Sequence, residues 1–146
     1  MIYDPIRQLY VARTPEEEVR QQWIRELLLE GYPPSLMAVE KELRTLPHLS
    51  SFPLGEVPKR RADIIVFAKD SRHALSPLLM IECKVAPLTA SFKRQVIGYN
   101  GVVGAPFVAI ANLKTLLLGA YQPSLGSFLF EEGLKSYQKL LELCQA

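Results

Sequence analysis

Two short apolar runs near the middle of the chain carry charged residues where buried strands usually have none. The runs cover residues 61–67 and 78–85, and their aliphatic and β-branched residues predict two strands. Side chains alternate between the two faces of a strand, so Glu82 and Lys84 should share one face. Asp63 is the acidic residue of the first run. Because an unpaired buried charge is costly, these three residues predict either a functional site or an ion-pair cluster.

The pattern before these runs predicts a helix and a further strand. Thr14 and Pro15 are typical of an N-cap and a first helical residue, and Glu17 completes a capping box. Apolar residues then recur every three to four positions until Gly31, which ends the helix. Residues 1–13 predict an irregular arm, 36–43 a strand and 45–57 a loop.

The pattern after these runs predicts a helix, a buried strand, a strand pair and a last helix. The corresponding residues are 89–103, with Thr89 or Ser91 as the cap, 106–111, 116–121 with 127–130, and 134–144. A helix between two strands forms a crossover, so the strands at 78–85 and 106–111 should be parallel. The connection from 67 to 78 is short, so those strands should be antiparallel. We expect one α/β domain over residues 1–146, with a mixed sheet of four or five strands flanked by helices.

Composition and length are those of an ordinary globular domain. The chain has 146 residues, 49% hydrophobic and 22% charged, with a formal net charge of +2. We expect a cytoplasmic protein, because no apolar run approaches the roughly 20 residues of a membrane span and no signal peptide is visible. Cys83 and Cys144 lack disulfide or zinc spacing and should be buried or inert thiols. The absence of a phosphate-binding loop motif excludes an ATP-driven motor.

The three charged residues fit a divalent-metal site. Asp63 and Glu82 can supply oxygen ligands to a Mg²⁺-type cation, which keeps several waters and takes further ligands from phosphate. Lys84 can then orient the attacking water or stabilise charge on the phosphate. A salt bridge from Lys84 to Asp63 or Glu82 that only ties two strands together is the alternative, and the sequence leaves it open.

Four segments of the chain also resemble a known family. An acidic residue, followed about twenty positions later by Glu-x-Lys on the next strand, resembles the PD-(D/E)xK nuclease superfamily. Segments 15–21, 61–64 and 81–84, with Gln95 and Tyr99 four positions apart, resemble the nuclease domain at the N-terminus of type I restriction enzyme R subunits. This resemblance spans about residues 3–112. It implies a restriction-endonuclease-like core and hydrolysis of DNA phosphodiester bonds with Mg²⁺, for which Mn²⁺ can substitute.

The resemblance also implies roles for individual residues. Asp63 and Glu82 would hold the metal, the backbone carbonyl of Cys83 would add a ligand, and Lys84 would serve the water. Glu17 of the first helix would reach the site, although a capping residue is the alternative. Gln95 would support the site and the DNA, although a plain surface residue is the alternative.

Basic residues near the proposed site are candidates for DNA contact. Arg60 and Arg61 adjoin the Asp63 strand, and Lys93 precedes Gln95. Such clusters either contact phosphate or form a solvated face. Tyr99 would contact DNA or, alternatively, form the edge of the core.

The sequence leaves open the role of Glu40, the protein partners and an alternative function. Glu40 matches an acidic position of the family, but an exposed-face glutamate is the commoner case. DNA is the expected partner, with either a homodimer or separate motor and specificity subunits. The alternative function is a non-catalytic nucleic-acid-binding or assembly module that keeps the fold.

Overall fold

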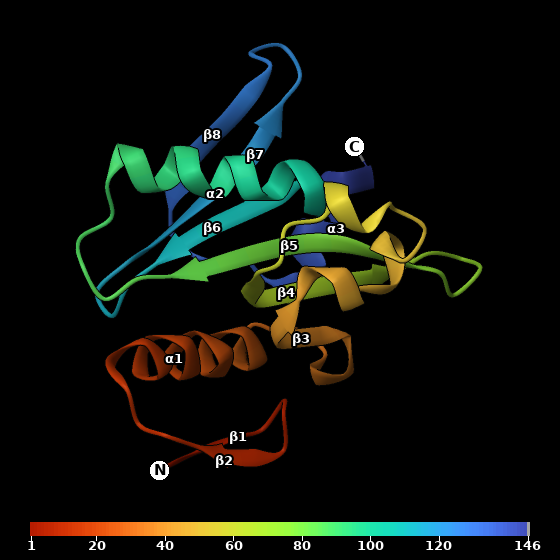
Figure 1. Ribbon diagram of the computed structural model, residues 1–146. Helices are drawn as coiled ribbons and strands as arrows, with labels where there is room; N and C mark the ends of the chain where they lie inside the picture. The colour runs from red at the N-terminus through yellow and green to blue at the C-terminus, as the bar shows by residue number, and fades with distance from the viewer. Residues whose placement is uncertain (146) are drawn as a thin grey trace.

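In the computed structural model, which describes residues 1–145, a mixed sheet lies between two layers of helices (Figure 1). The strands of this sheet, in spatial order, are β3 (Met37–Glu42), β4 (Arg61–Lys69), β5 (Leu75–Cys83), β6 (Phe107–Ala111), β7 (Leu116–Gln122) and β8 (Ser127–Glu132). The helices are α1 (Pro15–Leu29), α2 (Ala90–Val103) and α3 (Tyr137–Gln145). The remaining elements are the hairpin strands β1 (Ile2–Asp4) and β2 (Leu9–Val11) and the short 3₁₀ turns η1 (Pro34–Leu36), η2 (Leu43–Thr45), η3 (Pro47–Leu49) and η4 (Leu54–Glu56).

The strands follow one another across the sheet in chain order, and one neighbouring pair is parallel. Strands β3, β4 and β5 are antiparallel neighbours, and so are β6, β7 and β8. Strands β5 and β6 are parallel and are joined by α2, as the pattern predicts. The predicted strand number is wrong, because the described part of the chain places six strands in the sheet instead of four or five. Both strands of the last pair join the sheet, since β7 pairs with β6 along its length.

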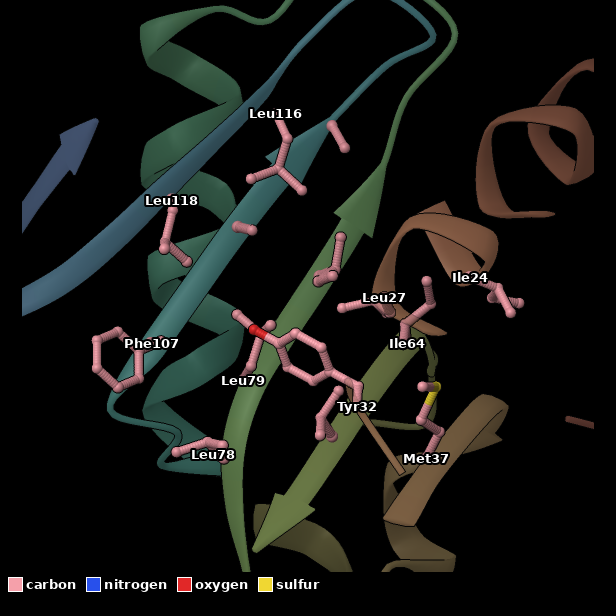
Figure 2. Packing of buried hydrophobic residues seen from close by; sticks show 14 of the residues in the cluster. Ile24, Leu27, Tyr32, Met37, Ile64, Leu78, Leu79, Phe107, Leu116 and Leu118 are labelled. Atoms are coloured by element: carbon pink, nitrogen blue, oxygen red, sulfur yellow. The ribbon is translucent and has the colours of Figure 1, made fainter. Parts of the chain in front are cut away.

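Apolar side chains fill both faces of the sheet. On one face, α1 and α3 pack over a cluster that includes Ile24, Leu27, Ile64 and Leu79 (Figure 2). On the other face, α2 packs over a second cluster through residues such as Val96. Further buried members from the helix, from η2 and η3, and from the residue between these turns are Phe92, Val103, Leu43, Leu49 and Leu46. The clusters fix α1 and α2 on opposite sides of β4 and β5.

Helices α1 and α2 begin where the sequence predicts. The hydroxyl of Thr14 accepts a hydrogen bond from the backbone of Glu17 at 3.1 Å, and Thr89 does the same for Phe92 at 3.1 Å. The second half of the predicted capping box is wrong. The backbone N–H of Thr14 donates to Ala12 at 3.0 Å, while the Glu17 carboxylate accepts from arginines. The Glu17 carboxylate therefore forms ion pairs with Arg7 and Arg20 instead of capping the helix.

Three expectations about the chain outside the central strands need correction. Residues 1–13 contain the hairpin β1–β2 instead of an irregular arm, because three-residue strands are too short to show an alternating pattern. The predicted loop 45–57 contains 3₁₀ turns and contributes Leu49 and Val57 to the core. Cys83 and Cys144, expected to be buried or inert thiols, are both free, and neither is fully buried: Cys83 is half-buried and Cys144 is exposed. No helix in residues 1–145 is long and apolar enough to cross a membrane.

Candidate active site

Asp63 and Glu82 meet where β4 and β5 separate. The regular pairing of these strands ends with Ile64 opposite Ile81, and each acid is the next residue beyond this pair on its strand. The backbone N–H of Asp63 donates to Glu82 Oε2 at 3.0 Å, and the backbone N–H of Cys83 donates to Asp63 Oδ2 at 2.9 Å. Each carboxylate thus binds the backbone of the opposite strand. The strand pairing brings the two acids together, as the sequence predicts.

The guanidinium of Arg20 lies among three carboxylates from α1, β3 and β4. It donates to Asp63 Oδ1 through Nη2 at 2.6 Å and Nε at 3.1 Å. It also donates to Glu17 Oε1 at 2.6 Å and to Glu40 Oε1. Burial alone would lower the pKa of Arg20, but Asp63, Glu40 and Glu17 outweigh it and the pKa is raised. Arg20 is therefore a fixed positive charge beside Asp63.

The guanidinium of Arg60 approaches Glu82 from the other side. Its Nη2 donates to Glu82 Oε1 and, at 3.1 Å, to the backbone carbonyl of Arg61. Its Cζ lies 3.5 Å from the centroid of the Tyr99 ring on α2, a close cation–π contact. Its Nη1 is buried and has no hydrogen-bond partner in the described part of the chain. Asp63 and Glu82 thus each have an arginine partner.

The Glu82 side chain is only 3% exposed, and this changes its protonation. Burial, followed by the nearby carboxylate of Asp63, raises the pKa of Glu82 to about 8, and the attraction of Arg60 does not cancel these effects. Burial also raises the pKa of the adjacent Cys83 thiol. Proximity of two carboxylates in a poorly solvated place favours a proton or a metal cation between them.

Lys84 follows β5 and lies on the same side of the sheet as Glu82. Its backbone N–H donates to Ala111 at 2.8 Å, and its Nζ lies 4.8 Å from the centroid of the Phe92 ring on α2. The structure forms no ion pair between Lys84 and a carboxylate within residues 1–145. The salt-bridge alternative for Lys84 is therefore wrong, since Arg20 and Arg60 take those partners.

A second buried network connects Glu17 to the N-terminal hairpin. Arg7 donates to Glu17 Oε2 at 2.8 Å and to Asp4 Oδ2 at 2.6 Å, and Gln21 contacts the same two oxygens at 3.1 Å and 2.9 Å. The Asp4 carboxylate is fully buried. Burial alone would raise the pKa of Asp4, but hydrogen bonds from Arg7, Ile6 and Gln21 lower it. The hairpin is thereby connected to Asp63 through Glu17 and Arg20.

The other candidate residues lie around this centre. Tyr99 is half-buried under Arg60, and Arg61 is exposed, with Nη1 3.5 Å from the backbone carbonyl of Glu40. Gln95 is exposed on α2, and its side chain makes no hydrogen bond in the described residues. Lys93 lies against β8, with Nζ 5.2 Å from the centroid of the Phe130 ring.

Sequence reasoning missed several residues that complete the arrangement. Arg20 shares the polar edge of α1 with Glu17, which was a usable signal. The sequence left the role of Glu40 open between a family acidic position and an exposed-face residue; in the structure it has a φ of 54° and binds Arg20. This left-handed conformation interrupts the alternation of β3, so face assignment by period two fails there. Asp4 and Arg7 had no signal, because a three-residue strand and the turn that follows it show no period.

Asp63 and Glu82 form a donor set that fits Mg²⁺. Residues 1–145 contain no group of three or more His, Cys, Asp or Glu side chains arranged to hold a metal. Mg²⁺ is commonly held by only one or two carboxylates, with water and phosphate completing its shell. Each carboxylate also offers about four lone-pair positions, so the hydrogen bonds to Arg20 and Arg60 leave room for a cation. The raised pKa of Glu82 agrees with such a site.

Comparison with known proteins places this α/β domain among restriction-enzyme components. The family model described as type I restriction enzyme R protein N terminus matches residues 15–128. The match covers most of the sequence, and the chain therefore belongs to the family of type I restriction enzyme R protein N termini. It includes Asp63, Glu82 and Lys84, while the hairpin β1–β2 precedes it and α3 follows it. Searches of curated proteins and of solved structures found no match.

Proposed function

We propose that this chain is a PD-(D/E)xK-type nuclease domain that hydrolyses DNA phosphodiester bonds with Mg²⁺, or with Mn²⁺ in its place. One observation carries the proposal: Asp63 and Glu82 meet at the diverging ends of β4 and β5, with Lys84 two residues further on the same face as Glu82. Family membership supports it, because restriction enzymes act on DNA.

Asp63 and Glu82 would hold the metal, and the carbonyl of Cys83 would add a ligand. A bound Mg²⁺ would lower the pKa of a coordinated water and offset charge on the phosphoryl oxygens. The protein contributes a poorly solvated carboxylate pair whose positions are fixed by backbone N–H groups. Glu17 would act through Arg20, which keeps the Asp63 side chain in place.

Lys84 would serve the attacking water. Its ammonium group lies beside Phe92 and is not neutralised by a carboxylate within the described residues, so its charge is available to a water or a phosphate. Gln95 would act at the same side of α2, one helical turn before Tyr99. Its exposed amide is suited to contact DNA instead of the core.

The surface beside the carboxylates would bind the DNA backbone. Arg60 and Arg61 lie next to Asp63, and Tyr99 supports Arg60 from α2. Lys93 would contact DNA further along α2. Because the family is part of a restriction enzyme, a motor or specificity subunit, or a second copy of this chain, would be the protein partner.

The second candidate function is a non-catalytic module that binds nucleic acid or other subunits. One observation favours it: all four carboxylate oxygens of Asp63 and Glu82 already accept hydrogen bonds from arginine side chains or backbone N–H groups. Such a network can hold β3, β4 and α1 together without any metal.

The experiment that separates the two functions is cleavage by the parent and by Lys84→Met. Supercoiled, linear, single-stranded and branched DNA are incubated with Mg²⁺ or Mn²⁺. An enzyme should lose roughly 10²-fold or more of its rate in Lys84→Met, the scale for one acid–base or electrostatic group. DNA affinity should change less than about tenfold and the thermal melt should stay close to the parent.

Lys114→Met is the matched control, because Lys114 is an exposed lysine in the turn between β6 and β7. It should cleave like the parent. A parent protein that binds DNA but cuts none of the four forms with either metal would support the non-catalytic module.

A further inference from the structure

The two arginines that neutralise the carboxylate pair are held very differently. Arg20 binds Asp63, Glu17 and Glu40, and its side chain is only 8% exposed. Every nitrogen of its guanidinium donates to a carboxylate. Moving Arg20 away from its three buried or half-buried acidic partners would be costly, since each carboxylate would lose its counter-charge.

Arg60 is bound less completely. Its side chain is 25% exposed, and within residues 1–145 its ion pair is with Glu82 alone. Its Nη1 is buried without a hydrogen-bond partner, which is an unfavourable state for a charged donor. The cation–π contact with Tyr99 holds the guanidinium of Arg60 without requiring its pair with Glu82. Arg60 can therefore change its acceptor while it stays on the Tyr99 ring.

Resting on the proposed function, we propose that Arg60 is a displaceable counter-charge that competes with the metal ion for Glu82. In the absence of DNA its guanidinium donates to Glu82 Oε1, and its positive charge repels the metal ion. When a DNA phosphate reaches the site, Arg60 moves from the carboxylate to a phosphate oxygen, and its unpartnered Nη1 gains an acceptor. The carboxylate is then open to the metal.

The consequence is that DNA and metal bind with positive coupling. Each ligand favours the arrangement in which Arg60 has left Glu82, so each raises the affinity for the other by the same factor. A phosphate that directly coordinates the metal also produces coupling. The distinguishing property is therefore the affinity for metal without DNA, which should rise when the charge of Arg60 is removed.

The test is Mn²⁺ titration of the DNA-free protein by calorimetry or electron paramagnetic resonance. Arg60→Gln keeps a donor for Glu82 but removes the charge, and it should bind Mn²⁺ at least about fivefold more tightly than the parent, within the usual range of coupling. A proton on Glu82 also gains from this change, but a divalent ion gains twice as much from the same potential. Arg60→Lys keeps the charge and should bind Mn²⁺ like the parent.

Arg61→Gln is the matched control, because Arg61 is the neighbouring arginine, exposed and paired with no carboxylate in the described structure. Its affinity for Mn²⁺ without DNA should stay within about twofold of the parent. Thermal melts without metal establish that each variant is folded. Lys84→Met should not cleave DNA at a useful rate, so it allows Mn²⁺ affinity to be measured with DNA bound. Addition of a short duplex to this variant should tighten Mn²⁺ binding. The double variant with Arg60→Gln should show a smaller gain.

The outcomes separate this proposal from the nuclease proposal. Equal or weaker Mn²⁺ binding by folded Arg60→Gln, in a parent that binds Mn²⁺ and cleaves DNA, overturns the displacement of Arg60 and leaves the nuclease intact. Should Arg60→Gln be unfolded, parent-like Mn²⁺ affinity in Arg60→Lys supports the proposal and tightened affinity overturns it. No Mn²⁺ binding by the parent, with or without DNA, overturns both proposals.

Discussion

Arg20 donates two hydrogen bonds to the same carboxylate oxygen of Asp63, although the two residues lie 43 positions apart in the chain. This contact joins α1 to the end of β4 and places a positive charge beside one of the two candidate metal ligands. It makes the position of Asp63 depend on a helix that the strand pattern alone would not associate with it.

Replacement of Arg20 should be strongly destabilising. Arg20→Met leaves Glu17, Glu40 and Asp63 without their shared counter-charge, and breaking a buried ion pair costs about 3–5 kcal/mol. Urea denaturation monitored by circular dichroism gives the free energy of unfolding. Arg25→Met, at an exposed position of the same helix, is the control and should lie within about 0.5 kcal/mol of the parent. A loss no larger than that of the control would show that the three carboxylates do not depend on Arg20.

The carboxylate pair should make stability depend on pH. The pKa of Glu82 is about 8 in the folded protein, against 4.5 when unperturbed. Between these pH values the folded state retains a proton that the unfolded state has released. The free energy of unfolding should therefore fall as pH rises, at up to about 1.4 kcal/mol per pH unit.

Metal-free denaturation curves between pH 4.5 and 8 measure this slope. Glu82→Gln removes the titrating group and should flatten that part of the curve, whereas Glu26→Gln, at an exposed position of α1, should leave it unchanged. Superimposable slopes for the parent and Glu82→Gln would contradict a raised pKa.

Mn²⁺ affinity should depend more strongly on Asp63 and Glu82 than on Glu40, a third carboxylate that lies close to them. Asp63→Asn and Glu82→Gln should each weaken Mn²⁺ binding about tenfold or more, because each removes a charged ligand. Glu40→Gln should have a smaller effect, since Glu40 binds Arg20 and contacts neither acid of the pair. Calorimetric titration compares the three variants, and equal affinity in all of them would exclude this metal site.

DNA binding should be sensitive to salt through the two arginines before Asp63. Replacing Arg60 and Arg61 by alanine should weaken binding to DNA of any sequence and reduce the slope of log affinity against log salt by about 0.9 per lost phosphate contact. Fluorescence anisotropy from about 50 to 200 mM salt measures this slope. The control replaces Lys69 and Arg72, which lie at the far end of the same strand pair and are exposed. The same slope in both double variants would show that Arg60 and Arg61 form a solvated edge and do not contact phosphate.

The sequence predicted the elements that have a clear period or a capping residue. Thr14 and Thr89 mark the starts of α1 and α2, and the buried run before Asn112 is a parallel central strand. Asp63 and Glu82 were predictable as neighbours because a short connection requires antiparallel pairing. These features depend on residues that are close together in the sequence, so a single sequence is enough to predict them.

The ion pairs around these acids could not be predicted in the same way. Arg20 reaches Asp63 only after α1 packs on the sheet, and Arg60 reaches Glu82 only when Tyr99 supports it from α2. Both contacts depend on the packing of helices on opposite faces. The sequence left open a salt bridge from Lys84 to Asp63 or Glu82, but the Lys84 side chain packs on Phe92.

The position of the acids within a local hairpin has a consequence for the order of folding. Asp63 and Glu82 are 19 positions apart, on strands that are neighbours in the chain and in the sheet. Closing so short a loop costs little chain entropy, and contacts of low sequence separation form early. Pairing of β5 with β6 must wait for the α2 crossover. The acidic pair should therefore assemble while much of the sheet is still unformed, and the nascent chain would carry it before Arg60 has its support on Tyr99.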